Sequence, residues 1–131
     1  MRLRKKILLI FLIFIAMNLF SQIYNPQKEI NTKLRVVLIY ESNIYGQKDF
    51  VTMKGINLTD KKLYTLEIAP RWFLKKNFFS IIAPGEVINI IGALSIDRKN
   101  RILIREISYK SKNILLRTKQ GFPLWRVPHK E

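Results

Sequence analysis

Cysteine is absent from the 131 residues of this chain. Its absence excludes disulfide bonds, thiolate metal sites, covalent attachment of a c-type haem and a lipidated N-terminal cysteine. Histidine occurs once, as His129 near the end of the chain. A single histidine in a chain terminus is a poor candidate for catalysis or metal binding. We therefore expect neither a metal site nor a cofactor.

Acidic residues are also scarce, and the nine aspartates and glutamates are scattered along the chain. Asp49, Asp60 and Asp97 fall in predicted turns, where local hydrogen bonding favours aspartate. No pair of carboxylates has a spacing suited to acid–base catalysis. The sequence also contains no nucleophile elbow, P-loop or HExxH motif. We therefore predict a protein that is not an enzyme.

The scarcity of acidic residues leaves a large excess of positive charge. Lysine and arginine together number 24, which gives a formal net charge of +15. Such an excess favours an anionic neighbour, which could be nucleic acid, membrane head groups or an acidic protein. A lysine-rich composition bias without any partner explains the same numbers. Hydrophobic residues make up 48% of the chain, which indicates a folded protein rather than a disordered one.

The N-terminus has the pattern of an export signal. Four basic residues among the first six precede an apolar run, Ile7–Phe20, that only Asn18 interrupts. As a helix these 14 residues span about 21 Å, less than a ~30 Å hydrocarbon core. This length favours a signal peptide with a cleavage point near Ser21. The run extends to Tyr24 if its polar residues are tolerated, so an uncleaved membrane anchor stays open.

These observations divide the chain into three parts. Residues 1–24 are a signal peptide or membrane anchor, residues 25–33 are a polar spacer that contains Pro26, and residues 34–131 are one folded domain. The positive-inside rule places everything after the leader outside the cytoplasm. We therefore expect a periplasmic domain, or one anchored to the cytoplasmic membrane with its folded part outside.

The folded part shows the alternation of apolar and polar residues that is typical of β-strands. In the third strand, Tyr64, Leu66 and Ile68 form the apolar face. A short helix of one or two turns is expected after this strand, beginning at Pro70. Gly92 lies inside a long β-rich run and indicates a bulge or bend. Strands are predicted at 34–41, 50–57, 63–69, 87–96, 101–109 and 114–118.

This pattern predicts an all-β fold, a small OB-like barrel of five to six strands with one short helix, preceded by an N-terminal hydrophobic signal or anchor helix. No strand–helix–strand spacing suggests a parallel α/β sheet. A flat meander is the alternative, and it would leave long apolar edges open to aggregation.

Two segments pair proline with tryptophan and arginine, "APRWFL" and "GFPLWR". We predict a binding surface made of Arg71, Trp72, Arg117, Trp125 and Arg126, because tryptophan and arginine are favoured at the centres of interfaces. A structural interpretation competes with it: each indole closes one end of the barrel and stays buried.

The order "LEIAPRWFLKKNFFSIIAPGEVINIIGALS … ILIREISYKSKNILLRTKQGFPLW" resembles exported bacterial OB-like domains, including the domain shared by the magnetosome proteins MamS and MamX. The similarity runs from about Tyr64 to Trp125. It departs at Ala69, where glycine is usual, and at Ala93, where serine is usual. Some relatives carry c-type haem motifs, but a chain without cysteine cannot carry over that chemistry. The resemblance implies an exported OB-like domain.

Our first functional prediction is a non-enzymatic binding or assembly module of the cell envelope, with an envelope protein, anionic lipid or anionic polymer as partner. The alternative is an OB protein that binds single-stranded nucleic acid or another polyanion. The expected export of the domain disfavours nucleic acid. Aromatic residues that could stack on bases, beside nearby lysines and arginines, are Tyr40, Tyr45, Phe50, Tyr64 and Tyr109.

Overall fold

The computed structural model describes residues 24–44, 46–77 and 82–126. Almost all of the predicted leader, residues 1–24, lies outside the described residues. Within the described ranges, no helix has both the length and the apolar character needed to cross a membrane.

The described residues form six strands and one short α-helix. The first element of the described part is a 3₁₀ turn, η1 (Pro26–Lys28), and the last is another, η2 (Leu124–Arg126). Between them lie β1 (Glu29–Ile44), β2 (Gln47–Asn57), β3 (Leu63–Pro70), α2 (Arg71–Lys76), β4 (Val87–Leu94), β5 (Arg101–Tyr109) and β6 (Lys112–Leu115).

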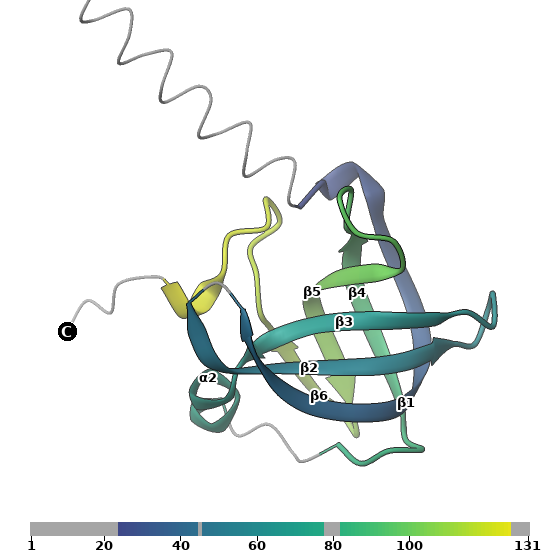
Figure 1. The fold of residues 1–131 in the computed structure, drawn as a ribbon, viewed down its shortest axis with the longest axis horizontal. Helices are drawn as coiled ribbons and strands as arrows, with labels where there is room; N and C mark the ends of the chain where they lie inside the picture. The colour runs from purple at the N-terminus through teal and green to yellow at the C-terminus, as the bar shows by residue number, and fades with distance from the viewer. Residues whose placement is uncertain (1–23, 45, 78–81, 127–131) are drawn as a thin grey trace, which may run out of the picture.

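The sheet closes on itself into a small barrel (Figure 1). The strand order is β3-β2-β1-β4-β5-β6, and an additional pairing between β3 and β5 closes β1–β5 into a ring, with β6 attached to the outer side of β5 as the second strand of a hairpin. The β3–β5 pairing is parallel, and the other pairings are antiparallel. The all-β barrel with one short helix after the third strand is confirmed.

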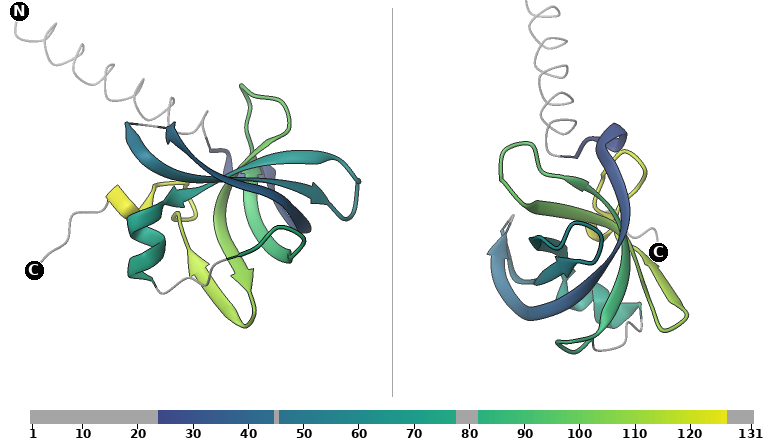
Figure 2. Two further views of the ribbon diagram at one scale, coloured as in Figure 1. Left: turned by 60° about the horizontal axis from the view of Figure 1, so that its bottom comes forward. Right: turned by 90° about the vertical axis from the view of Figure 1, so that its right-hand side faces the viewer.

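The long strand β1 is shared between the two halves of the barrel (Figure 2). Residues 29–35 pair with β4, whereas residues 34–44 pair with β2. The expected irregularity at Gly92 is present, because the β4–β5 register shifts between Ile91 and Gly92. A Cβ atom at Gly92 would lie 2.4 Å from the carbonyl oxygen of Leu103, so the close strand approach requires glycine.

The core is filled by the inward-facing residues of the six strands. The predicted apolar face of β3 is confirmed: Tyr64, Leu66 and Ile68 are all buried. Ile88 and Ile90 of β4 contribute to the same cluster. Burial of this apolar surface is the main stabilising contribution to the fold.

The segment 25–33, predicted as a spacer, belongs to the fold. Asn25 caps η1 by accepting a hydrogen bond from the backbone of Gln27 at 3.0 Å. Residues 29–33 are the first part of β1 and pair with β4. The segment looks like a spacer because the outward face of this part of β1 is polar.

Tyr24 docks the beginning of the described chain onto the barrel. Its side chain is 1% exposed and packs with Ala93 and Leu103. Its hydroxyl group donates a hydrogen bond to Glu29 at 2.6 Å, and Arg105 donates to the same carboxylate at 2.5 and 3.2 Å. The folded domain therefore includes residues 24–33, which precede the predicted boundary at residue 34.

Candidate functional site

The C-terminal tryptophan of the predicted surface is buried at one end of the barrel. Trp125 is 6% exposed. Its ring makes edge-on contacts with Phe50, at a centroid distance of 5.6 Å, and with Phe73 of α2, at 6.0 Å. This geometry is the one that the structural interpretation predicts for Trp125.

Arg117 lies beneath the surface together with Trp125. Only 4% of Arg117 is exposed, and its guanidinium carbon is 5.1 Å from the centroid of the Trp125 ring. Its Nη1 group donates a hydrogen bond to the carbonyl oxygen of Gly121 at 3.1 Å. A buried arginine needs such partners because desolvation of an isolated charge is costly. Arg117 thus holds the last turn of the chain against Trp125.

Trp72 and its neighbours differ from Trp125 in exposure. Trp72 is 44% exposed, and Phe73 takes the inward position beside Trp125. Arg71 and Arg126 are exposed, and Arg71 forms an ion pair with Glu41 at 2.5 Å. The five predicted residues therefore divide into a buried pair, Arg117 and Trp125, and an exposed group, whose partner binding stays a prediction.

A separate cleft lies between the end of β1 and the loop that joins β4 to β5. Its volume is about 300 Å³. Asn43 and Ile44 form one side, and the β4–β5 loop with the beginning of β5 forms the other. We refer to it as the loop cleft. Its lining residues are Asn43, Ile44, Glu67, Ser95, Asp97, Arg98, Arg101 and Leu103.

An ion pair lies at the inner wall of the loop cleft. The Arg101 Nε atom is 3.4 Å from the Glu67 carboxylate, and their side chains are 18% and 4% exposed. Glu67 pairs in register with Thr52 of β2, which is also buried and lies 3.2 Å from the hydroxyl of Ser42. The polar side chains of Glu67, Thr52 and Ser42 therefore lie next to one another beneath the cleft.

The outer wall of the loop cleft is an ordered turn. The backbone N–H of Ser95 donates to the carbonyl of Arg101 at 2.7 Å, which closes the loop. The Ser95 hydroxyl donates to the Asp97 carboxylate and holds the pKa of Asp97 below its usual value. Asp97 is therefore an anion at neutral pH, beside the exposed cation Arg98.

The loop cleft thus presents charges of both signs on short, ordered loops. Such an arrangement can bind a polar ligand that also carries both charges. Within the described ranges, no group of three or more His, Cys, Asp or Glu side chains could hold a metal ion.

Sequence reasoning missed this cleft because its residues come from four separate segments. One signal was present: Glu67 interrupts the apolar strand "LYTLEIA". A carboxylate in such a strand needs a charged partner, which Arg101 supplies from the neighbouring strand β5.

The aromatic residues proposed for base stacking lie mostly inside the barrel. Phe50, Tyr64 and Tyr109 are buried, and Tyr40 is partly buried. Tyr45 lies outside the described residues. None of the described residues that line the loop cleft is aromatic.

Comparisons of the chain with protein-family models, with curated proteins and with solved structures found no match.

Proposed function

We propose that this chain is a non-enzymatic OB-like binding module of the cell envelope, exported or membrane-tethered, that holds a segment of a partner protein in the loop cleft. The observation that supports the fold assignment is the ring β1-β2-β3-β5-β4 with a helix between β3 and β4. This arrangement resembles the five-stranded OB barrel, which uses its β1–β2 and β4–β5 loops to bind ligands. The loop cleft lies between the end of β1, next to the first of these loops, and the β4–β5 loop.

The charges of the loop cleft favour a protein segment over a nucleic acid. A single-stranded nucleic acid needs aromatic platforms and an evenly positive groove. Among the described residues that line the cleft there is no aromatic side chain, and the two arginines are accompanied by two carboxylates. A peptide with acidic and basic side chains complements such a mixture.

The envelope location is supported by the basic and apolar pattern of the first 20 residues. It is tested by protease treatment of intact cells and spheroplasts that produce the tagged chain. We expect digestion in spheroplasts and protection in intact cells. Protection in both preparations would place the domain in the cytoplasm and contradict the proposal.

Site-directed photocrosslinking tests the binding surface. A photoreactive residue at Asn43 or Arg98 should give a discrete adduct with one envelope protein. The same residue at the exposed position Lys62, in the β2–β3 turn, is the control and should give no adduct. Arg98→Glu, combined with the probe at Asn43, should reduce the adduct. Equal adducts from the cleft and control positions would refute the assignment.

The nucleic-acid alternative has a direct test as well. If the purified chain shifted single-stranded DNA in a salt-sensitive manner, and if the domain were cytoplasmic, the alternative would replace our proposal.

A further inference from the structure

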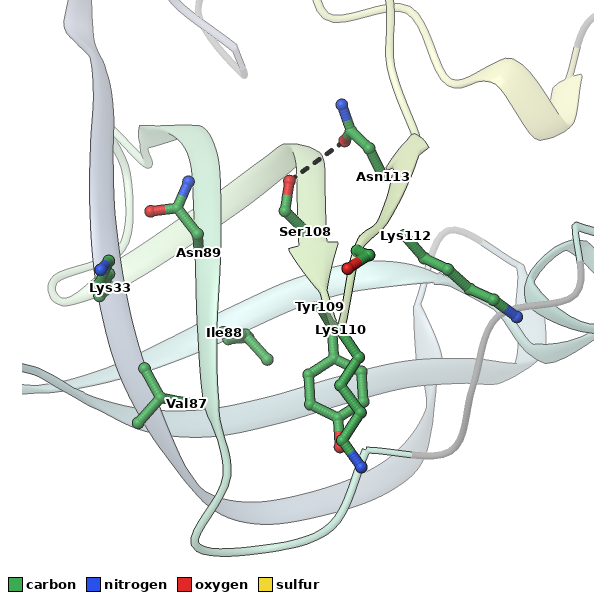
Figure 3. A pocket seen from close by; sticks show the side chains of 10 residues that line it. Lys33, Val87, Ile88, Asn89, Ser108, Tyr109, Lys110, Lys112 and Asn113 are labelled. Carbon is green, nitrogen blue, oxygen red and sulfur yellow. Dashed lines mark hydrogen bonds between the residues drawn. The ribbon is translucent and has the colours of Figure 1, made fainter.

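A second cleft opens where β4 and the β5–β6 hairpin diverge (Figure 3). Its volume is about 440 Å³ and ten residues line it. It lies at the beginning of β4 and the end of β5, whereas the loop cleft lies at the end of β4 and the beginning of β5. The two clefts share no residue, and we refer to this one as the hairpin cleft.

Four strands place polar side chains in one row along the hairpin cleft. The register pairs Lys33 of β1 with Asn89 of β4, Asn89 with Ser108 of β5, and Ser108 with Asn113 of β6. Neighbouring strands lie about 4.8 Å apart, so the row offers hydrogen-bonding groups at regular intervals. The Ser108 hydroxyl donates to Asn113 at 3.3 Å, as the dashed line in Figure 3 shows. The amide nitrogens of Asn89 and Asn113 also donate hydrogen bonds to Asn31 and Glu106. Each amide keeps a second N–H group, and the carbonyl and hydroxyl oxygens of the row can accept further hydrogen bonds.

The charged side chains among the described residues that line the hairpin cleft are all basic. They are Lys33, Lys110 and Lys112. Lys33 and Lys110 lie on opposite sides of the gap, whereas the Lys112 side chain is directed away from it (Figure 3). Neither Lys33 nor Lys110 forms an ion pair with a described residue. Two ammonium groups therefore remain available for an anion.

The hairpin turn that carries Lys110 has an unfavourable backbone. Tyr109 pairs with Lys112, so Lys110 and Ser111 form a two-residue turn, with φ angles of 46° and 65°. Positive φ at both positions is the pattern of a type I′ turn, which strongly prefers Asn-Gly. Lysine and serine are disfavoured in this conformation. Strain retained at a surface cleft points to a role for these side chains beyond folding.

The inner side of the hairpin cleft is apolar. Ile88 and Tyr109 lie between the β4 ribbon and the hairpin (Figure 3), and both are nearly fully buried. The Lys110 ammonium group is 5.2 Å from the centroid of the Tyr109 ring. An apolar base, a row of amides and hydroxyls, and unpaired ammonium groups together suit a hydroxyl-rich ligand with an anionic substituent.

We propose that the hairpin cleft binds an acidic saccharide, with its hydroxyl groups on the Asn89–Ser108–Asn113 row and its phosphate or carboxylate group between Lys33 and Lys110. This inference stands on its own residues and does not depend on the partner of the loop cleft.

Calorimetry of the full chain in a sugar-free polyoxyethylene detergent tests the proposal. The probes are trehalose 6-phosphate, digalacturonic acid, unmodified trehalose and inorganic phosphate. We expect at least one acidic saccharide to bind, and to bind about tenfold more tightly than trehalose or inorganic phosphate. The two acidic probes distinguish a phosphate from a carboxylate as the preferred anion. Affinity should fall with added salt, because the ammonium groups contribute by charge.

Two sets of variants locate the site. Lys33→Gln with Lys110→Gln should weaken binding about tenfold. Lys48→Gln with Lys119→Gln removes the same charge outside the cleft and should change affinity less than about twofold. Lys110→Asn with Ser111→Gly introduces the preferred turn residues, so the melting temperature should not fall, while binding should weaken about threefold.

The proposal is overturned by any of three results. Neither acidic saccharide binds; trehalose or inorganic phosphate binds as tightly as the acidic saccharides; or the cleft variants bind like the control variant. The turn variant ensures that lost binding is not mistaken for lost folding.

Discussion

Replacement of Trp125 by alanine tests how the end of the barrel is closed. Trp125 is 6% exposed and contacts Phe50, Phe73 and Arg117. Truncation of a buried tryptophan to alanine costs about 3–5 kcal/mol, because transfer energy is lost and a cavity remains. The variant also removes the ring that stacks on the buried Arg117 guanidinium, so the cost should lie at the upper end of this range.

This cost is a large fraction of the stability of the whole domain. Domains of this size unfold with a free energy of about 5–15 kcal/mol. A loss of about 5 kcal/mol lowers the melting temperature by roughly 20–40 °C. The matched control is Trp72→Ala, which removes the same side chain from a position that is 44% exposed. We expect it to cost about 1 kcal/mol or less.

The assay is urea unfolding of the full chain in detergent, followed by far-ultraviolet circular dichroism. Circular dichroism is preferred to fluorescence because each variant removes one of the two tryptophans. Trp125→Phe should recover part of the loss, because a ring remains between Phe50 and Phe73. If Trp125→Ala and Trp72→Ala had equal effects, Trp125 would not be the residue that closes the barrel.

Two further predictions concern the docking of Tyr24. Gly121→Ala should destabilise the fold by about 2–4 kcal/mol, because the new Cβ would lie 2.5 Å from the Cβ of Tyr24 and φ is +96°. Gly46→Ala is the control, because Gly46 also has a positive φ, +76°, but a Cβ added there would have no atom within 4 Å. This variant should lose about 1 kcal/mol of stability. Equal losses for the two variants in chemical denaturation would contradict the Tyr24 contact. Burial raises the pKa of Glu29, but hydrogen bonds from Arg105 and Tyr24 outweigh this effect and hold it below its usual value. A lowered pKa in the folded state stabilises the fold above pH ~4.3, and this contribution is lost as the pH falls through the lowered pKa. The melting temperature of the Glu29→Gln variant should therefore fall less between pH 7 and pH 3 than that of the wild-type chain. An equal fall in both proteins would refute the role of the ion pair.

The strands were predictable because apolar residues recur in them with a period close to two residues. Tyr64, Leu66 and Ile68 alternate with Thr65 and Glu67, and the burial of β3 follows this alternation at its first four positions. The single helix was predictable from Pro70, but α2 begins one residue later than expected: Pro70 has an extended backbone and is the N-cap residue, and Arg71 is the first helical residue. Local pattern is sufficient for these elements because each buries one face against a single core.

The two tryptophans show where local pattern is insufficient. Both stand in similar segments, yet Trp125 is buried and Trp72 is not. In α2 successive side chains rotate by about 100°, so only one of Trp72 and Phe73 can face the core. The direction in which α2 leaves β3 makes that residue Phe73, and this direction is a tertiary property. The loop cleft was missed for the same reason, since its residues meet only when the barrel closes.

The start of the domain carries the clearest consequence of such tertiary contacts. A tyrosine followed by nine polar or mixed residues has the pattern of a linker, but Gly121, almost a hundred positions later, leaves room for the Tyr24 ring. The Glu29–Arg105 ion pair then joins β1 to β5 at the same place. In the sequence, only three residues lie between Tyr24 and the apolar run Ile7–Phe20. Cleavage near Ser21 would leave Tyr24 in the mature chain and able to dock. An uncleaved leader would instead hold the barrel close to the membrane by the side on which Tyr24, Glu29 and Gly121 lie.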